Sequence, residues 1–144
     1  MNEGRRQMVT TREYFWNSSR GKRVLEHFIS KRTYKTISGL TVRSKSEARI
    51  ANYLSKHNLQ FEYEKEIEIF GNKYRPDFYL PKYNIYIEFF GLSHIPSYKE
   101  KCDEKKSSYA KAKIICIYLY HKGSKNLEWI LEKELTKNRI IVTK

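Results

Sequence analysis

Two carboxylates in neighbouring segments have the setting of a metal-dependent catalytic pair. Asp77 lies in the segment YRPDFYL and Glu88 in the segment NIYIEFF. Alternate side chains of a strand point to opposite faces, so each acid points away from its apolar neighbours. If the two strands pair, the acids lie side by side and would bind a hard cation such as Mg²⁺ or Mn²⁺. On spacing alone, two solvent-exposed carboxylates beside surface lysines are the alternative.

A third acid, Glu47, lies on the core-facing side of a predicted helix. It shares one helical stripe with the apolar residues Ile50, Ala51 and Leu54. Two explanations compete for its carboxylate. Ser44 and Glu47 have the spacing of a helix capping box. Alternatively, Glu47 meets the two strand acids over the sheet and completes a metal site.

A lysine in a later predicted helix is the candidate catalytic cation. Lys105 shares a helix face with Tyr98, Cys102 and Tyr109. A lysine among such neighbours either extends outward to water or points at an anion. Lys106 lies close to the same face and is a rival for the role.

The net charge of +13 favours a polyanionic partner. Residues 1–45 contain eleven Lys and Arg against three Glu, and aromatic residues are interleaved with this basic run. We therefore expect DNA as the partner, contacted through an N-terminal arm. The predicted contacts to nucleic acid are Arg5, Arg6, Arg12, Arg20, Lys22, Arg23, Lys31, Arg32, Arg43 and Lys45.

The sequence argues against several other classes. No segment approaches the roughly 20 apolar residues that span a bilayer, and no apolar stretch near the N-terminus indicates a signal peptide. The two cysteines and four histidines lack zinc-finger spacing. Two thiols with no local spacing partner suit a reducing compartment. We expect no membrane partner and a cytoplasmic, nucleoid-associated location.

Hydrophobic patterning predicts the elements that must position these residues. A helix is expected over 44–57, followed by an antiparallel meander of three strands over 61–70, 73–80 and 84–90, with a turn at 71–72. A loop over 91–97 then precedes a helix over 98–111, a buried strand over 112–120, a helix over 124–137 and an edge strand over 139–142. This order predicts an α/β fold with a central mixed sheet flanked by helices. We expect a basic arm at 1–40 and one domain at 41–144.

The ordered set of motifs resembles the PD-(D/E)XK nuclease superfamily. The likeness is closest to small nuclease modules of some DNA helicases, and more distant to very-short-patch-repair-like endonucleases. It covers roughly residues 42–120, and its carriers are RSKSEARIANYL, FEYE, YRPDFYLP, IYIEFFG and the helix that holds Tyr98, Lys105 and Tyr109.

The resemblance implies a restriction-endonuclease-like core with an acid triad on one edge of the sheet. Glu47 matches the helical acid, Asp77 the Asp of the motif, and Glu88 the acid of the following strand. The family pattern places a lysine two residues after that acid, where this chain has Phe90. Some branches supply the cation from the next helix, which points to Lys105.

These expectations combine into one predicted activity, a Mg²⁺- or Mn²⁺-dependent DNA endonuclease. The resemblance implies that the products carry 5′-phosphate and 3′-hydroxyl ends. The ion is expected between Asp77 and Glu88, aided by Glu47 and the backbone carbonyl of Phe89. His94 matches a position that is often histidine or polar in the repair-like branch, and a surface loop histidine is the simpler interpretation. Two alternatives stay open: a junction resolvase of the same superfamily, and a DNA-binding module that does not cleave. The sequence leaves a homodimer open.

Overall fold

A four-stranded mixed sheet forms the centre of the computed structural model, which describes residues 33–143. Its strand order is β3 (Glu62–Tyr63), β6 (Phe78–Leu80), β7 (Ile85–Phe90) and β8 (Cys116–Tyr120). The β3–β6 and β6–β7 pairs are antiparallel, and β7 pairs with β8 in parallel. The predicted α/β class and the mixed sheet are therefore confirmed.

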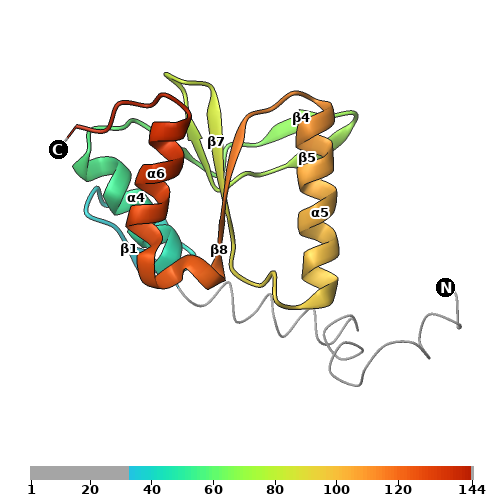
Figure 1. Ribbon diagram of the computed structural model, residues 1–144, viewed down its shortest axis with the longest axis horizontal. Helices are drawn as coiled ribbons and strands as arrows, with labels where there is room; N and C mark the ends of the chain where they lie inside the picture. The colour runs from blue at the N-terminus through green and yellow to red at the C-terminus, as the bar shows by residue number, and fades with distance from the viewer. Residues whose placement is uncertain (1–32, 144) are drawn as a thin grey trace, which may run out of the picture.

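Helices cover the two faces of this sheet unequally (Figure 1). Helices α4 (Lys45–Lys56) and α6 (Leu127–Lys137) lie on one face, and α5 (Pro96–Lys111) lies on the other. Because parallel strands need a crossover connection, α5 links β7 to β8. The strand residues Ile85, Ile87, Ile117 and Leu119 belong to the core with residues of α4 and α6, including Ile50, Leu54, Leu131 and Leu135.

Alternation along β7 places Glu88 on the face of the sheet opposite to the aliphatic core. Tyr86, Glu88 and Phe90 alternate with the core residues of β7 and lie on the side covered by α5. In β8, Tyr118 is paired with Glu88 in the register and shares that face. The sheet thus separates an aliphatic core from a layer that holds a carboxylate and several aromatic rings.

The first two predicted meander strands are each broken at one place. The segment 61–70 divides into β3 and β4 (Ile67–Ile69), and the segment 73–80 divides into β5 (Asn72–Tyr74) and β6. Glu64 has a φ of 53°, and its N–H donates to the carbonyl of Asp77 (2.9 Å). On the other strand, Pro76 has no N–H for a ladder.

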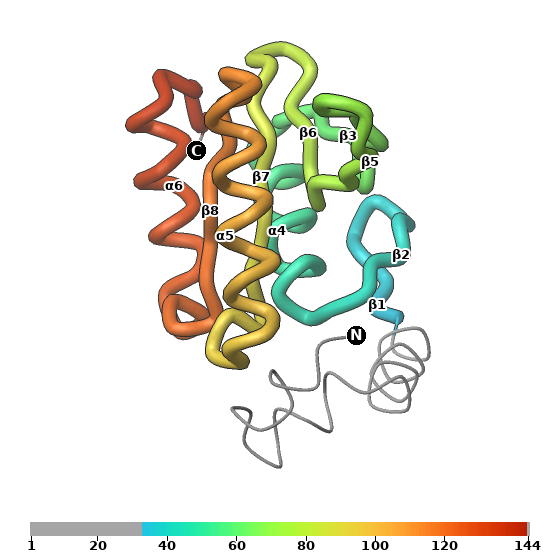
Figure 2. The backbone as a smooth tube through the Cα atoms, turned by 90° about the vertical axis from the view of Figure 1, so that its right-hand side faces the viewer, coloured from blue at the N-terminus to red at the C-terminus, as the bar shows by residue number. Residues whose placement is uncertain are grey.

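As a result, β4 and β5 pair only with each other, as a separate hairpin. Its turn lies at Phe70 and Gly71, one residue before the predicted position. The hairpin lies on the same side of the main sheet as α5 (Figures 1 and 2). Tyr74 OH and Ser108 Oγ are 3.0 Å apart, which joins β5 to α5.

Other element ends differ from the prediction for local reasons. Helix α5 begins two residues early, at Pro96, which suits the first turn because its missing N–H is not needed there. Strand β8 begins only at Cys116, after a left-handed residue at Lys113 with a φ of 57°. The predicted helix over 124–137 begins as a 3-10 helix, η1 (His121–Asn126), before α6.

The predicted edge strand over 139–142 was wrong. Arg139 has a φ of 62°, and no strand is assigned after α6 in the part of the chain that the structure describes. The segment instead runs beside the end of α4, where Thr143 Oγ1 donates to the carbonyl of His57 (3.0 Å). Ile140 is buried against the core, so packing rather than a ladder fixes this segment.

A small N-terminal hairpin precedes α4. It consists of β1 (Tyr34–Lys35) and β2 (Thr41–Val42), and Val42 is buried. The Ile37 N–H donates to Asn52 Oδ1 of α4 (2.9 Å). The predicted domain boundary between 40 and 41 therefore falls inside a hairpin attached to α4. Among residues 33–143, no helix has the length and apolar character to cross a membrane.

Candidate functional site

Asp77 and Glu88 lie opposite each other across the β6–β7 pair. The last paired residues are Phe78 and Ile87, and one further step of the same register brings the two acids together. The Asp77 N–H donates to Glu88 Oε1 (3.1 Å), and the Phe89 N–H donates to Asp77 Oδ2 (2.7 Å). Each carboxylate thus takes a backbone N–H from the strand of the other. The side-by-side arrangement expected from alternation is present.

Glu88 is an unusual buried acid, because its side chain is only 2% exposed. Two donors from α5 meet its Oε2 atom: the Lys105 ammonium at 3.2 Å and the Tyr109 hydroxyl at 3.2 Å. Burial raises the pKa of Glu88 above its ordinary value, and the charge of Lys105 opposes that rise. The carboxylate is therefore held by partners yet keeps a bias toward protonation.

Asp77 has a stronger bias of the same kind. Burial raises its pKa well above the ordinary value, and the charges of Glu88 and Glu47 raise it further. The Phe89 N–H and Lys105 act in the opposite direction. Two adjacent acids that resist ionisation form a site that a cation would stabilise.

Lys105, rather than its rival Lys106, reaches the acids. Burial lowers the pKa of Lys105, but attraction and hydrogen bonding to Glu88 outweigh this, so the pKa is raised overall and the ammonium form is favoured. Lys106 instead donates to Tyr120 OH at 2.7 Å. Consecutive residues of a helix point about 100° apart, so only one of the two can face Glu88.

Glu47 shows half of the predicted capping box, and its predicted role as a metal ligand stays a prediction. Its N–H donates to Ser44 Oγ (3.0 Å), so Ser44 caps the first turn of α4. Its carboxylate accepts from Tyr63 OH (3.0 Å) rather than from the backbone of Ser44. Glu47 is 7% exposed, and its charge contributes to the raised pKa of Asp77. Glu47 therefore belongs to the same electrostatic site as the strand acids.

The donor set fits Mg²⁺ or Mn²⁺ in a mode that uses few protein ligands. Within residues 33–143, no group of three or more His, Cys, Asp or Glu side chains is arranged to hold a metal ion by itself. Mg²⁺ commonly uses one or two carboxylates together with water and substrate phosphate. Asp77 and Glu88 supply two carboxylates at adjacent positions, and burial raises the pKa of both, so a bound cation would favour their ionised forms. The predicted role of the Phe89 carbonyl stays a prediction.

Phe90 fills the position at which the family pattern has a lysine. Its ring is buried and stacks on Tyr118, with centroids 5.5 Å apart and an interplanar angle of 21°. A lysine there would have to place its ammonium among aromatic rings. The cation beside Glu88 comes from α5 instead, and the catalytic role of Lys105 stays a prediction.

Two tyrosines also belong to the site, although sequence reasoning assigned them no role. Tyr109 donates to Glu88, and Tyr63 donates to Glu47. Burial and the nearby acid raise the pKa of both phenols, so both remain protonated donors. Tyr109 lies four residues after Lys105, on the same helix face, which was the available signal. Tyr63 has no comparable position, because its own strand carries no predicted site residue.

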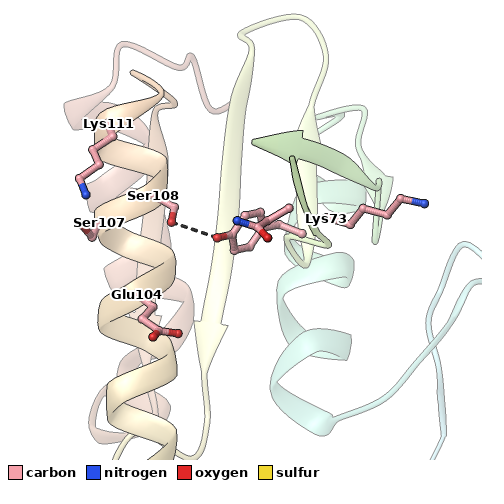
Figure 3. A pocket seen from close by; sticks show the side chains of 7 residues that line it. Lys73, Glu104, Ser107, Ser108 and Lys111 are labelled. Atoms are coloured by element: carbon pink, nitrogen blue, oxygen red, sulfur yellow. Dashed lines mark hydrogen bonds between the residues drawn. The ribbon is translucent and has the colours of Figure 1, made fainter. Parts of the chain in front are cut away.

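A polar cleft of about 500 Å³ opens between β5 and α5 (Figure 3). The Tyr74–Ser108 hydrogen bond crosses it, and the side chains of Lys73 and Lys111 extend away from that contact (Figure 3). The cleft is lined by Asn72, Lys73, Tyr74, Glu104, Ser107, Ser108 and Lys111.

Eight of the ten predicted nucleic-acid contacts lie outside the described residues: Arg5, Arg6, Arg12, Arg20, Lys22, Arg23, Lys31 and Arg32. Of the other two, Lys45 is exposed at the start of α4, and Arg43 forms a 3.0 Å ion pair with Glu64. His94 is exposed after β7, and its ring lies 5.9 Å from that of His121.

No protein-family model, curated protein or solved structure matches this chain. Any function must therefore be inferred from the geometry and electrostatics of the site itself.

Proposed function

We propose that this chain is a Mg²⁺- or Mn²⁺-dependent DNA endonuclease with a restriction-endonuclease-like core. The observation that carries the proposal is the opposed pair Asp77 and Glu88, with the Lys105 ammonium 3.2 Å from Glu88 Oε2. A structural ion pair needs one acid and one base. Here a second acid is placed beside the pair at an energetic cost, and that cost is explained if the acids serve to bind a cation.

Asp77 and Glu88 would hold the ion, with Glu47 as the third acid of the site. When bound, the ion lowers the pKa of a water molecule and offsets charge on the scissile phosphate. The backbone N–H groups of Asp77 and Phe89 fix the two carboxylates before any substrate arrives. This preorganisation reduces the reorganisation needed at the moment of reaction.

Lys105 would act on the phosphate directly. Its side chain is 36% exposed, whereas Glu88 is 2% exposed, so the ammonium lies where the buried acid meets solvent. A cation in this position stabilises the negative charge that develops on the phosphate in the transition state. It also helps to orient the attacking water.

DNA as the substrate is supported by charge. The chain has a net charge of +13, and much of the excess lies in its first 45 residues. Neutralising phosphates releases condensed counterions, which is the dominant sequence-independent part of DNA affinity. The acids form a small negative site within a positive chain, a combination that suits a phosphodiester bridged by a metal ion.

The direct test is Mg²⁺-dependent nicking of supercoiled plasmid by wild type and Asp77→Asn, with EDTA blanks. Asp103→Asn is the matched control, because it makes the same chemical change at an exposed position of α5. We expect cutting by wild type and the control, loss of at least about 100-fold in Asp77→Asn, and 5′-phosphate ends. Undiminished cutting by Asp77→Asn would reject the assignment.

The main rival is a DNA-binding module that does not cleave, motivated by Phe90 in the place of the family lysine. It predicts that wild type binds DNA but never nicks it with Mg²⁺ or Mn²⁺. The Lys105–Glu88 pair favours the enzyme, because the missing cation is present from a different element.

A further inference from the structure

We propose that Tyr109 is a positioning residue that fixes the orientation of Glu88 so that its free coordination capacity faces Asp77. This inference rests on the proposed function, because it concerns the same metal site. Tyr109 is completely buried, and its hydroxyl donates to Glu88 Oε2 (3.2 Å). A buried tyrosine hydroxyl without a partner would be costly, so this bond constrains both side chains.

The hydrogen bonds of Glu88 show which oxygen is left for a ligand. An ionised carboxylate offers about four acceptor positions on its two oxygens. Tyr109 and Lys105 both approach Oε2, and the Asp77 N–H approaches Oε1. The remaining position is therefore on Oε1, the oxygen that lies next to Asp77. A tilt of the carboxylate plane would take both oxygens out of these contacts and direct the free acceptor position away from the second acid.

The two donors on Oε2 differ in their freedom to move. Lys105 is partly exposed and has a flexible four-carbon stem, whereas the ring of Tyr109 is enclosed. Tyr74 meets that ring edge-on with centroids 5.6 Å apart, and Tyr118 lies nearly parallel to it at 6.5 Å. Lys105 can therefore turn toward a substrate phosphate while Tyr109 keeps Glu88 in place.

The experiment measures Mn²⁺ affinity of the full chain by electron paramagnetic resonance, without DNA and at constant pH. Tyr109→Phe removes the hydroxyl and keeps the ring. Tyr74→Phe is the matched control, because it removes the neighbouring hydroxyl that contacts Ser108 and not Glu88. We expect Mn²⁺ binding to weaken by about 10- to 100-fold in Tyr109→Phe and to change by less than about twofold in Tyr74→Phe. Thermal unfolding verifies that each variant is folded, and a purely structural role would lower stability without changing the metal affinity of the folded protein.

The outcomes separate the inference from the function on which it rests. If wild type binds Mn²⁺ and Tyr109→Phe binds it equally well, the positioning role is rejected and the proposed function stands. If wild type binds no Mn²⁺, both are rejected. If Tyr109→Phe does not fold, the double variant Tyr109→Phe/Glu88→Gln is expected to recover cooperative unfolding, because the buried charge is gone. Failure of the double variant to fold would also reject the positioning role.

Discussion

Asp77 and Glu88 exchange backbone contacts across the β6–β7 pair: the N–H of Asp77 binds the Glu88 carboxylate, and the Asp77 carboxylate binds the N–H of Phe89. Each acid is held by the strand that carries the other. The pair is thus part of the sheet rather than an attachment to its surface, and its geometry follows from strand register.

The energetic cost of ionising Asp77 should appear in the pH dependence of stability. Below about pH 4, the ordinary carboxyl pKa, Asp77 is protonated in both folded and unfolded chains and costs nothing. As the pH rises from about 4 through its raised folded pKa, the unfolded chain releases the proton first, so the folded state loses stability. The stability of Asp77→Asn relative to wild type should therefore increase over this range and then level off. The measurement is urea unfolding in EDTA between pH 4 and 9, and a constant difference would contradict the prediction.

Divalent metal should remove this cost. Asp77 and Glu88 must ionise to bind Mn²⁺, so binding competes with protons and should strengthen with pH. At a Mn²⁺ concentration 100 times the dissociation constant, a single site stabilises the fold by about 2.7 kcal/mol. We expect the melting temperature of wild type to rise with Mn²⁺, and to rise more at pH 8 than at pH 5. Asp103→Asn should behave like wild type, whereas Asp77→Asn should lose the shift. A shift that Asp77→Asn retains would place the ion elsewhere.

The two neighbouring lysines of α5 should separate in activity. Lys105→Ala removes the cation next to Glu88, and we expect a loss of about 100-fold in the rate of plasmid nicking at saturating metal. Lys106→Ala removes a contact to Tyr120 and should stay within a few-fold of wild type. DNA binding measured in EDTA should change little in either variant. If Lys106→Ala alone loses activity, the catalytic lysine has been misassigned.

The basic N-terminal segment should supply salt-sensitive affinity for DNA. Removing residues 1–32 deletes eight of the predicted phosphate contacts and leaves the β1–β2 hairpin, whose Thr36 is buried. The slope of log affinity against log salt should become shallower by up to about 0.9 per lost cation. Fluorescence anisotropy with a labelled duplex measures this slope at several salt concentrations. An unchanged slope would show that these residues make no phosphate contacts.

Strand alternation was sufficient to predict the central part of the site. It placed Asp77 and Glu88 on one face, because both strands are fixed by their apolar sides, and helix periodicity placed Glu47 and Lys105 toward them. The division of the meander could not be predicted in this way. The segment FEYEKEIEIF alternates without interruption, and the break depends on a positive φ at Glu64 and its contact with Asp77. The partners of Tyr63 and Tyr109 were also hidden, because they depend on how separate elements pack.

The contact between Glu64 and Asp77 joins the acid site to the β4–β5 hairpin. Asp77 uses its N–H for Glu88, its carbonyl for Glu64 and its side chain for Phe89. Asp77 lies between β5 and β6, where the long predicted strand is broken, and both its N–H and its carbonyl are hydrogen-bonded. The β4–β5 hairpin is thus attached, through Glu64, to the residue that carries one acid of the proposed metal site. A ligand that displaced the hairpin relative to α5 would therefore act on the residue that carries one acid of the proposed metal site.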